Sequence, residues 1–127
     1  MNAGPTNDLA HPFFAVTDYE IDASTHTVAL AGDVDLYTAP EFKSNLVGLI
    51  ERGKTRIIVD LTDAHFIDST TLGVLVGAMK RIRKAGGKLV VVCPDEDMRR
   101  LFDLTGLDHV FSIYDDRRAA VDAVRAL

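Results

Sequence analysis

The sequence predicts one α/β domain, a single mixed β-sheet with α-helices packed against it, in the order ββαβαβαβα. Three observations lead to this class. Short β-branched runs alternate with segments of helical periodicity. Two runs, 57–59 and 89–92, are continuously apolar, which is typical of strands covered on both faces in a parallel sheet. The length of 127 residues fits one domain, because domains commonly hold roughly 100–200 residues.

The first elements predicted are a tail and a hairpin. Residues 1–12 carry Gly, Pro, Asn and Asp with little apolar content, so we expect a flexible N-terminal tail ahead of a domain spanning 13–127. Strand candidates at 13–21 and 27–31 are separated by a short polar gap, which predicts a hairpin. The chain is expected to leave the second strand at Gly32.

A helix is predicted next. Thr38-Ala39-Pro40-Glu41 has the pattern of a capping box, in which the Thr38 hydroxyl accepts from the third amide and Glu41 reaches back. Gly53 is expected to end this helix, and 56–61 to form a buried strand. The apolar residues that recur at helical spacing are Phe42, Leu46, Leu49 and Ile50.

A second helix is predicted over 70–84, with Gly73 and Gly77 on one face because they are four residues apart. We expect Gly77 to allow close packing of this helix on the sheet. The remaining elements are a strand at 89–93, a helix between Asp95 and Gly106, a strand at 110–113 and a final helix capped by Asp115 or Asp116.

Composition excludes several classes of function. The formal net charge of −5 argues against a protein that binds the phosphate backbone of nucleic acids. The single cysteine, Cys93, excludes an internal disulfide framework and fits a reducing compartment. No apolar run approaches the roughly 20 residues of a membrane helix, and the N-terminus does not resemble a signal peptide. We therefore expect a soluble, cytoplasmic domain.

Asp68-Ser69-Thr70-Thr71 places four cap-forming residues before an apolar stripe. One such residue suffices for a cap, so the segment suggests a surface with a second task. A phosphate on Ser69 would meet free amides and the positive end of the helix dipole. Catalysis by a serine nucleophile is not supported, because no Gly-x-Ser-x-Gly elbow or spaced triad histidine is present. The sequence predicts no enzyme.

Three motifs, in the same order along the chain, resemble the STAS domain of anti-sigma factor antagonists. The segment 67–77 is similar to the family pattern Asp-Ser-Ser/Thr-Gly-Leu-Gly-Val-Leu, 32–40 resembles its Gly-Glu-Leu/Ile-Asp segment, and 86–89 with 100–107 resemble its third-helix region. The resemblance covers about residues 13–125. Thr71 stands where the family usually has Gly. Since a β-branched residue disfavours positive φ, this position is either already helical or the turn differs.

The resemblance implies a function as an anti-sigma factor antagonist. Its unphosphorylated form would bind an anti-sigma factor that is also a GHKL-type serine kinase, and so release a sigma factor. Phosphorylation of Ser69 would end this binding, and a PP2C-type phosphatase would restore it. No cofactor, metal, nucleic acid or membrane is implied. The partner-binding residues would be Asp33, Asp35, Tyr37, Asp68, Thr70, Thr71, Leu72 and Gly73.

Other interpretations stay open at this point. A STAS domain could sense a ligand or act as a scaffold without a sigma factor, because fold does not fix function. A receiver domain phosphorylated on Asp60 is less favoured, because no lysine follows the strand at 110–113. Metal binding has no diagnostic spacing, and the basic run 80–88 is interpreted as a solvated helix end. The acidic residues expected at one sheet end are Asp33, Asp35, Asp60, Asp63 and Asp68.

Overall fold

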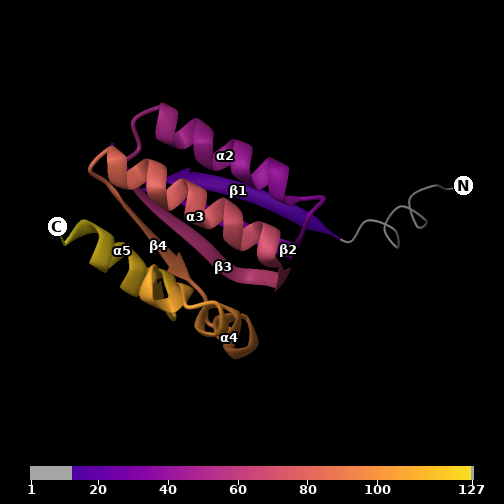
Figure 1. Ribbon diagram of the computed structural model, residues 1–127. Coiled ribbons are helices and arrows are strands. Elements are labelled where there is room, and N and C mark those ends of the chain that lie inside the picture. Colours follow the sequence, from indigo (N-terminus) through magenta and orange to yellow (C-terminus); the bar gives the residue numbers. More distant parts are fainter. Residues whose placement is uncertain (1–12, 127) are drawn as a thin grey trace, which may run out of the picture.

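The computed structural model describes residues 13–126 and confirms the predicted fold class (Figure 1). The predicted tail, 1–12, and Leu127 lie outside the described residues. The elements are β1 (Phe14–Glu20), β2 (Thr25–Val34), α2 (Ala39–Glu51), β3 (Arg56–Ile67), α3 (Ser69–Lys84), β4 (Lys88–Val92), α4 (Glu96–Leu104), the 3₁₀ helix η1 (Leu107–His109), β5 (Ser112–Tyr114) and α5 (Arg117–Arg125).

The five strands form one sheet in the order β1-β2-β3-β4-β5. The opening hairpin is antiparallel, and every later pair is parallel because a helix carries the chain back between strands. Helices α2, α3 and α4 pack on one face of the sheet, whereas α5 packs on the other. Both faces of β3 and β4 are therefore covered, which explains their uninterrupted apolar runs.

Two strands are longer than the sequence predicts. The chain does not leave β2 at Gly32, because β2 continues to Val34, and β3 continues to Ile67 beyond the expected end at Leu61. The two extensions pair with each other, Val34 opposite Ile67, after a shift in register next to Gly32. Gly32 has φ +83°, and a Cβ there would lie 1.9 Å from the Phe13 carbonyl oxygen. Only glycine fits this bulge, so the residue that suggested a turn instead keeps the strand paired.

The caps of the later helices agree with the sequence prediction. Asp95 accepts a hydrogen bond from the Met98 amide (2.9 Å), and Asp116, rather than Asp115, accepts one from the Ala119 amide (2.8 Å). Gly106 follows α4 with φ 76°, the left-handed conformation of a helix C′ residue. The short helix η1 was not expected from the sequence.

The expectation for Gly77 is wrong. A Cβ added at Gly77 or at Gly73 would meet no other group within 4 Å, and both residues are exposed. The side of α3 that packs on the sheet consists instead of larger residues such as Leu75 and Ile82, which are fully buried. Both glycines face a groove between α2 and α3.

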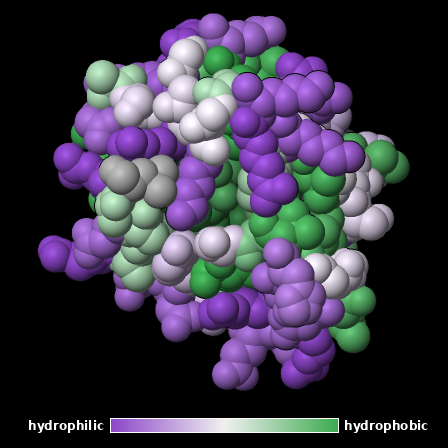
Figure 2. Space-filling model, turned by 60° about the vertical axis from the view of Figure 1, so that its left-hand side comes forward, coloured by the Kyte–Doolittle hydropathy of each residue, from purple (hydrophilic) through white to green (hydrophobic). Residues whose placement is uncertain are grey.

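Figure 2 shows one side of the molecule, where hydrophilic side chains surround a smaller area of apolar ones. Within residues 13–126, no helix is long and apolar enough to cross a membrane.

Candidate functional site

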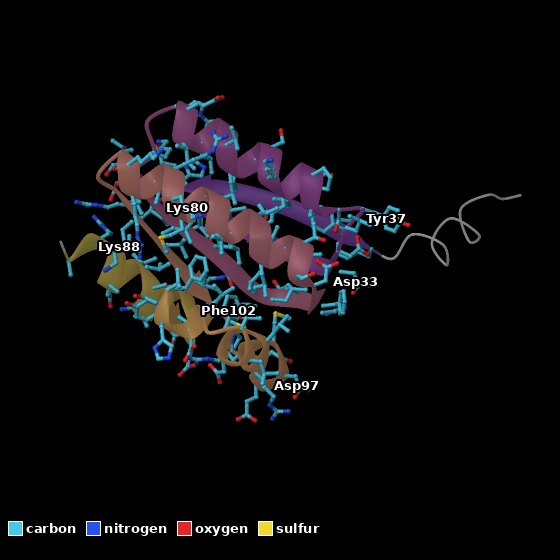
Figure 3. The ribbon with its side chains drawn as sticks, viewed as in Figure 1. Asp33, Tyr37, Lys80, Lys88, Asp97 and Phe102 are labelled. Carbon is cyan, nitrogen blue, oxygen red and sulfur yellow. The ribbon has the colours of Figure 1, made fainter. Side chains whose placement is uncertain are left out.

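The candidate site forms where β2 and β3 end side by side. Val34 pairs with Ile67, and each strand then leads into the start of a helix, α2 or α3. The turn after β2 and the Asp68-Ser69 step after β3 are therefore neighbours, as the sequence prediction requires. Figure 3 shows Asp33 and Tyr37 at this end of the molecule and Lys88 toward the opposite end.

Ser69 is the first residue of α3, and it is exposed. The Asp68 carboxylate caps the helix by accepting from the Thr71 amide (3.1 Å), and the first intrahelical bond runs from the Leu72 amide to the Asp68 carbonyl (3.1 Å). The amides of Ser69 and Thr70 precede this bond and belong to the first turn, whose donors have no partner within the helix. A negative group on Ser69 would lie at the positive end of the helix dipole.

Thr71 is fully buried, although the family resemblance places it among the partner-binding residues. Its side-chain hydroxyl donates to the Val34 carbonyl oxygen at 2.6 Å, which ties the first turn of α3 to the end of β2. The position is helical, and no non-glycine residue within 13–126 has positive φ. Leu72 is also buried, with 4% exposed. Neither side chain can contact a partner on this surface, so both act by holding the site in place.

The predicted capping box of α2 is wrong. The Thr38 side chain accepts no hydrogen bond from the amides of the helix. Instead, Thr38 and Asp35 form a box of reciprocal hydrogen bonds just before α2. The Asp35 amide donates to the Thr38 hydroxyl (2.8 Å), while Asp35 Oδ1 accepts from the amides of Tyr37 (2.9 Å) and Thr38 (3.1 Å). Asp35 directly follows β2, and its carboxylate accepts from two free amides, whereas the Thr38 hydroxyl accepts from none in the helix. One carboxylate oxygen of Asp35 is thus committed to the shape of its own turn.

Large apolar side chains are exposed in the turn after β2 and near the end of β3, the two segments that lead to this site. Tyr37 is 82% exposed, Leu36 60% and Phe66 49%. Leu36 and Phe66 were not singled out from the sequence, although a large apolar residue within a polar turn is a usable signal. Exposed aromatic anchors are characteristic of protein interfaces. We call these three residues, together with Asp33 and Ser69, the Ser69 face.

Acidic side chains make this end of the molecule negative. Asp33, Asp35 and Asp68 are half-buried in the strand ends and turns around Ser69. Within residues 13–126, no group of three or more His, Cys, Asp or Glu side chains is arranged to hold a metal ion. Apart from the buried Thr71 and Leu72, the predicted partner-binding residues are at least partly accessible: Asp33, Asp35, Tyr37, Asp68, Thr70 and Gly73.

Asp60 does not belong to the Ser69 face. Its side chain is 1% exposed, and it accepts hydrogen bonds from the Thr62 amide and from Arg117 at the start of α5. This bond to Asp60 raises the pKa of Arg117. A buried, paired carboxylate is a poor phosphoacceptor, so the geometry does not favour the receiver interpretation.

Comparisons of the sequence find known proteins that are similar to this chain. Residues 17–120 match the STAS domain family. The anti-sigma-B factor antagonist of Bacillus subtilis is 42% identical over 86 residues, which cover 68% of this chain and 78% of that protein. The protein of the same name in Listeria monocytogenes is 36% identical over 94 residues, covering 74% and 82%.

Solved structures share the fold. An anti-sigma factor antagonist from Mycobacterium paratuberculosis superposes with a TM-score of 0.81 at 26% identity, covering 89% of this chain and 95% of that one. SpoIIAA of Bacillus, solved in unphosphorylated and phosphorylated forms, gives TM-scores of 0.73 and 0.71 at 23% and 22% identity. These two alignments cover 89% and 87% of this chain and the whole of the SpoIIAA chains.

Proposed function

The chain belongs to the STAS-domain anti-sigma factor antagonists, and on that premise we propose that Ser69 is the phosphorylation site that switches its binding to an anti-sigma factor off. The observation that carries the proposal is the place of Ser69. It is the exposed first residue of α3, between a capped helix end and a set of exposed apolar side chains.

In the unphosphorylated state, the Ser69 face binds the anti-sigma factor and thereby displaces the sigma factor. Tyr37, Leu36 and Phe66 supply apolar contact area, and burying such side chains commonly provides most of the binding free energy at an interface. The box between Asp35 and Thr38 and the bond from Thr71 to Val34 fix the two turns in advance. Little conformational entropy is then lost on binding.

In the phosphorylated state, the same surface gains a charge of roughly −1.5 to −2. The phosphate sits at a helix N-terminus, where free amides and the dipole tolerate it, so the domain stays folded. It adds to the charges of Asp33, Asp35 and Asp68 and occupies space inside the interface. A mismatched interfacial charge costs about 2–5 kcal/mol, which weakens binding by at least about 30-fold.

The chemistry of the switch belongs to the partners. We assign the phosphoryl transfer to an anti-sigma factor of the GHKL serine-kinase type and the reset to a PP2C-type phosphatase. The domain itself acts as a regulatory binding protein without catalytic activity, and we place it in the cytoplasm with the sigma factor that it controls.

Mass mapping after incubation with the partner kinase and ATP tests the site. We expect one phosphate, on Ser69, and none after Ser69→Ala. Ser44→Ala is a matched control, because Ser44 is an exposed serine on α2 away from the helix start. Phosphate on Thr70 or Ser44 in place of Ser69 would refute the assignment of the site and leave the family membership intact.

A further inference from the structure

An open groove of about 510 Å³ runs between α2 and α3, outside the Ser69 face. Both helices follow parallel strands, so they start at the same end of the sheet and lie alongside each other (Figure 1). The groove is deep over Gly73 and Gly77, because neither has a side chain and a Cβ at either position would meet nothing within 4 Å. Its walls are mainly aliphatic: Leu46, Val47, Val74 and Ala78.

The length of the groove suits an extended small molecule. Its lining extends on α3 from Thr70 to Arg81, which is roughly 16 Å along a helix at 1.5 Å per residue. An extended hydrocarbon chain can follow this length and contact the aliphatic walls at about 4 Å.

The charges that line the groove are positive. Arg81 lies in the last turn of α3 and Lys43 in the second turn of α2, and neither forms an ion pair with any residue in 13–126. Around Arg81, three more cations of α3 are exposed: Lys80, Arg83 and Lys84. The end near Thr70 carries Lys43 but lies close to the acidic side chains of the Ser69 face, whereas the Arg81 end has cations alone. An anion is therefore favoured at the Arg81 end.

We propose that this groove is a binding site for an aliphatic carboxylate of the fatty-acid type. The hydrocarbon chain lies along Val47, Val74 and Ala78 over the two glycines, and the carboxylate is held by the Arg81 guanidinium, which suits it as a bidentate donor. Pockets of about 300–1,000 Å³ with apolar walls and few polar groups are typical of small-molecule sites. Thr70 and Gly73 line the groove and are also predicted partner-binding residues, but Arg81 lies at the other end of α3 from Ser69, so binding of the carboxylate does not require the proposed phosphorylation.

Calorimetric titration of the full chain with sodium decanoate, below its micelle concentration, tests the proposal. We expect saturable binding of one decanoate per chain and no comparable binding of decanol. Arg81→Gln should weaken decanoate binding roughly tenfold or more, whereas the control Lys80→Gln, on the same helix but outside the groove, should not change it. Decanol binding as tightly as decanoate would contradict the proposal, as would an unchanged affinity in Arg81→Gln.

Filling the groove gives a second, independent test. Gly77→Leu places a side chain in open space and improves helix propensity, so the variant should melt no lower than wild type while decanoate binding is lost. Gly48→Leu is the matched control, because it makes the same change on α2, also with nothing within 4 Å of the new Cβ, outside the groove. Gly73→Leu serves if Gly77→Leu does not fold. Full decanoate affinity in a folded, filled variant would overturn the proposal, whatever the state of Ser69.

Discussion

The Thr71 hydroxyl donates a hydrogen bond to the Val34 carbonyl oxygen, 2.6 Å away, and so joins the first turn of α3 to the last residue of β2. Both groups are buried, and the two segments lie 37 residues apart in the chain. The bond fixes the position of Ser69 relative to the turn that carries Tyr37. The arrangement of the Ser69 face thus depends on a buried hydroxyl.

Thr71→Val should therefore destabilise the domain, because it keeps the shape of the side chain but leaves the Val34 carbonyl unsatisfied. We expect a loss of about 1–3 kcal/mol in the free energy of unfolding, measured by urea denaturation. Thr71→Ser, which keeps the hydroxyl, should lose less. Thr70→Val on the half-exposed neighbour should stay within about 0.5 kcal/mol. Equal stability of Thr71→Val and Thr70→Val would contradict the role given to the bond.

The box between Asp35 and Thr38 predicts a difference between two substitutions at one position. Asp35→Ala removes the acceptor of the Tyr37 and Thr38 amides and should cost about 1 kcal/mol of stability. Asp35→Asn keeps an oxygen acceptor and should cost less. Thermal melts of both variants check this order, and an equal loss in both would show that the charge of Asp35, not its hydrogen-bond acceptor, holds the turn.

Tyr37→Ala should separate binding from stability. The side chain is 82% exposed, so its removal should change the free energy of unfolding by less than about 0.5 kcal/mol. As an aromatic anchor, however, it should cost about 2 kcal/mol or more of binding to the anti-sigma factor. Leu104→Ala is the matched control, because Leu104 is 77% exposed but lies on α4. Similar affinities of the two variants in calorimetry would refute the position of the interface.

Asp18 predicts a dependence of stability on pH. Hydrogen bonds from Asn45 and His26 lower the pKa of Asp18 in the folded protein. The stabilisation is then present above the ordinary Asp pKa of about 3.9. It is lost as the pH falls through the lower pKa that Asp18 has in the folded protein. Asp18→Asn should be less stable than wild type at pH 7, and the difference should shrink below about pH 4. Urea denaturation of both proteins at several pH values checks this, and a difference that stays constant between pH 7 and about pH 3 would contradict the role given to Asp18.

The fold class was predictable because β3 and β4 are apolar on both faces and helices of clear periodicity separate them. The full length of β2 and β3 was not predictable. Asp33 and its surroundings have the composition of a turn, and only the pairing of Asp33 with Phe66, 33 positions away in the sequence, keeps them in the sheet. Local composition does not carry such long-range pairing.

The place of the candidate site was predictable from the motifs that resemble the family. The contacts that each of its residues makes were not predictable. Thr38 and Asp35 are both of residue types that cap helices well. Which of the two side chains accepts the free backbone amides depends on where β2 ends. The family resemblance places Thr71 among the residues that bind the partner. Its helical spacing from Leu75 and Ile82, both fully buried, would have indicated the inward face.

The most direct test compares the affinity of the anti-sigma factor for the unphosphorylated chain and for the chain fully phosphorylated on Ser69, measured by calorimetry at one salt concentration. Circular dichroism of both forms should show the same fold. The charge added at the start of α3 predicts that phosphorylation weakens binding by at least about 30-fold. Equal affinity of the two folded forms would contradict the account.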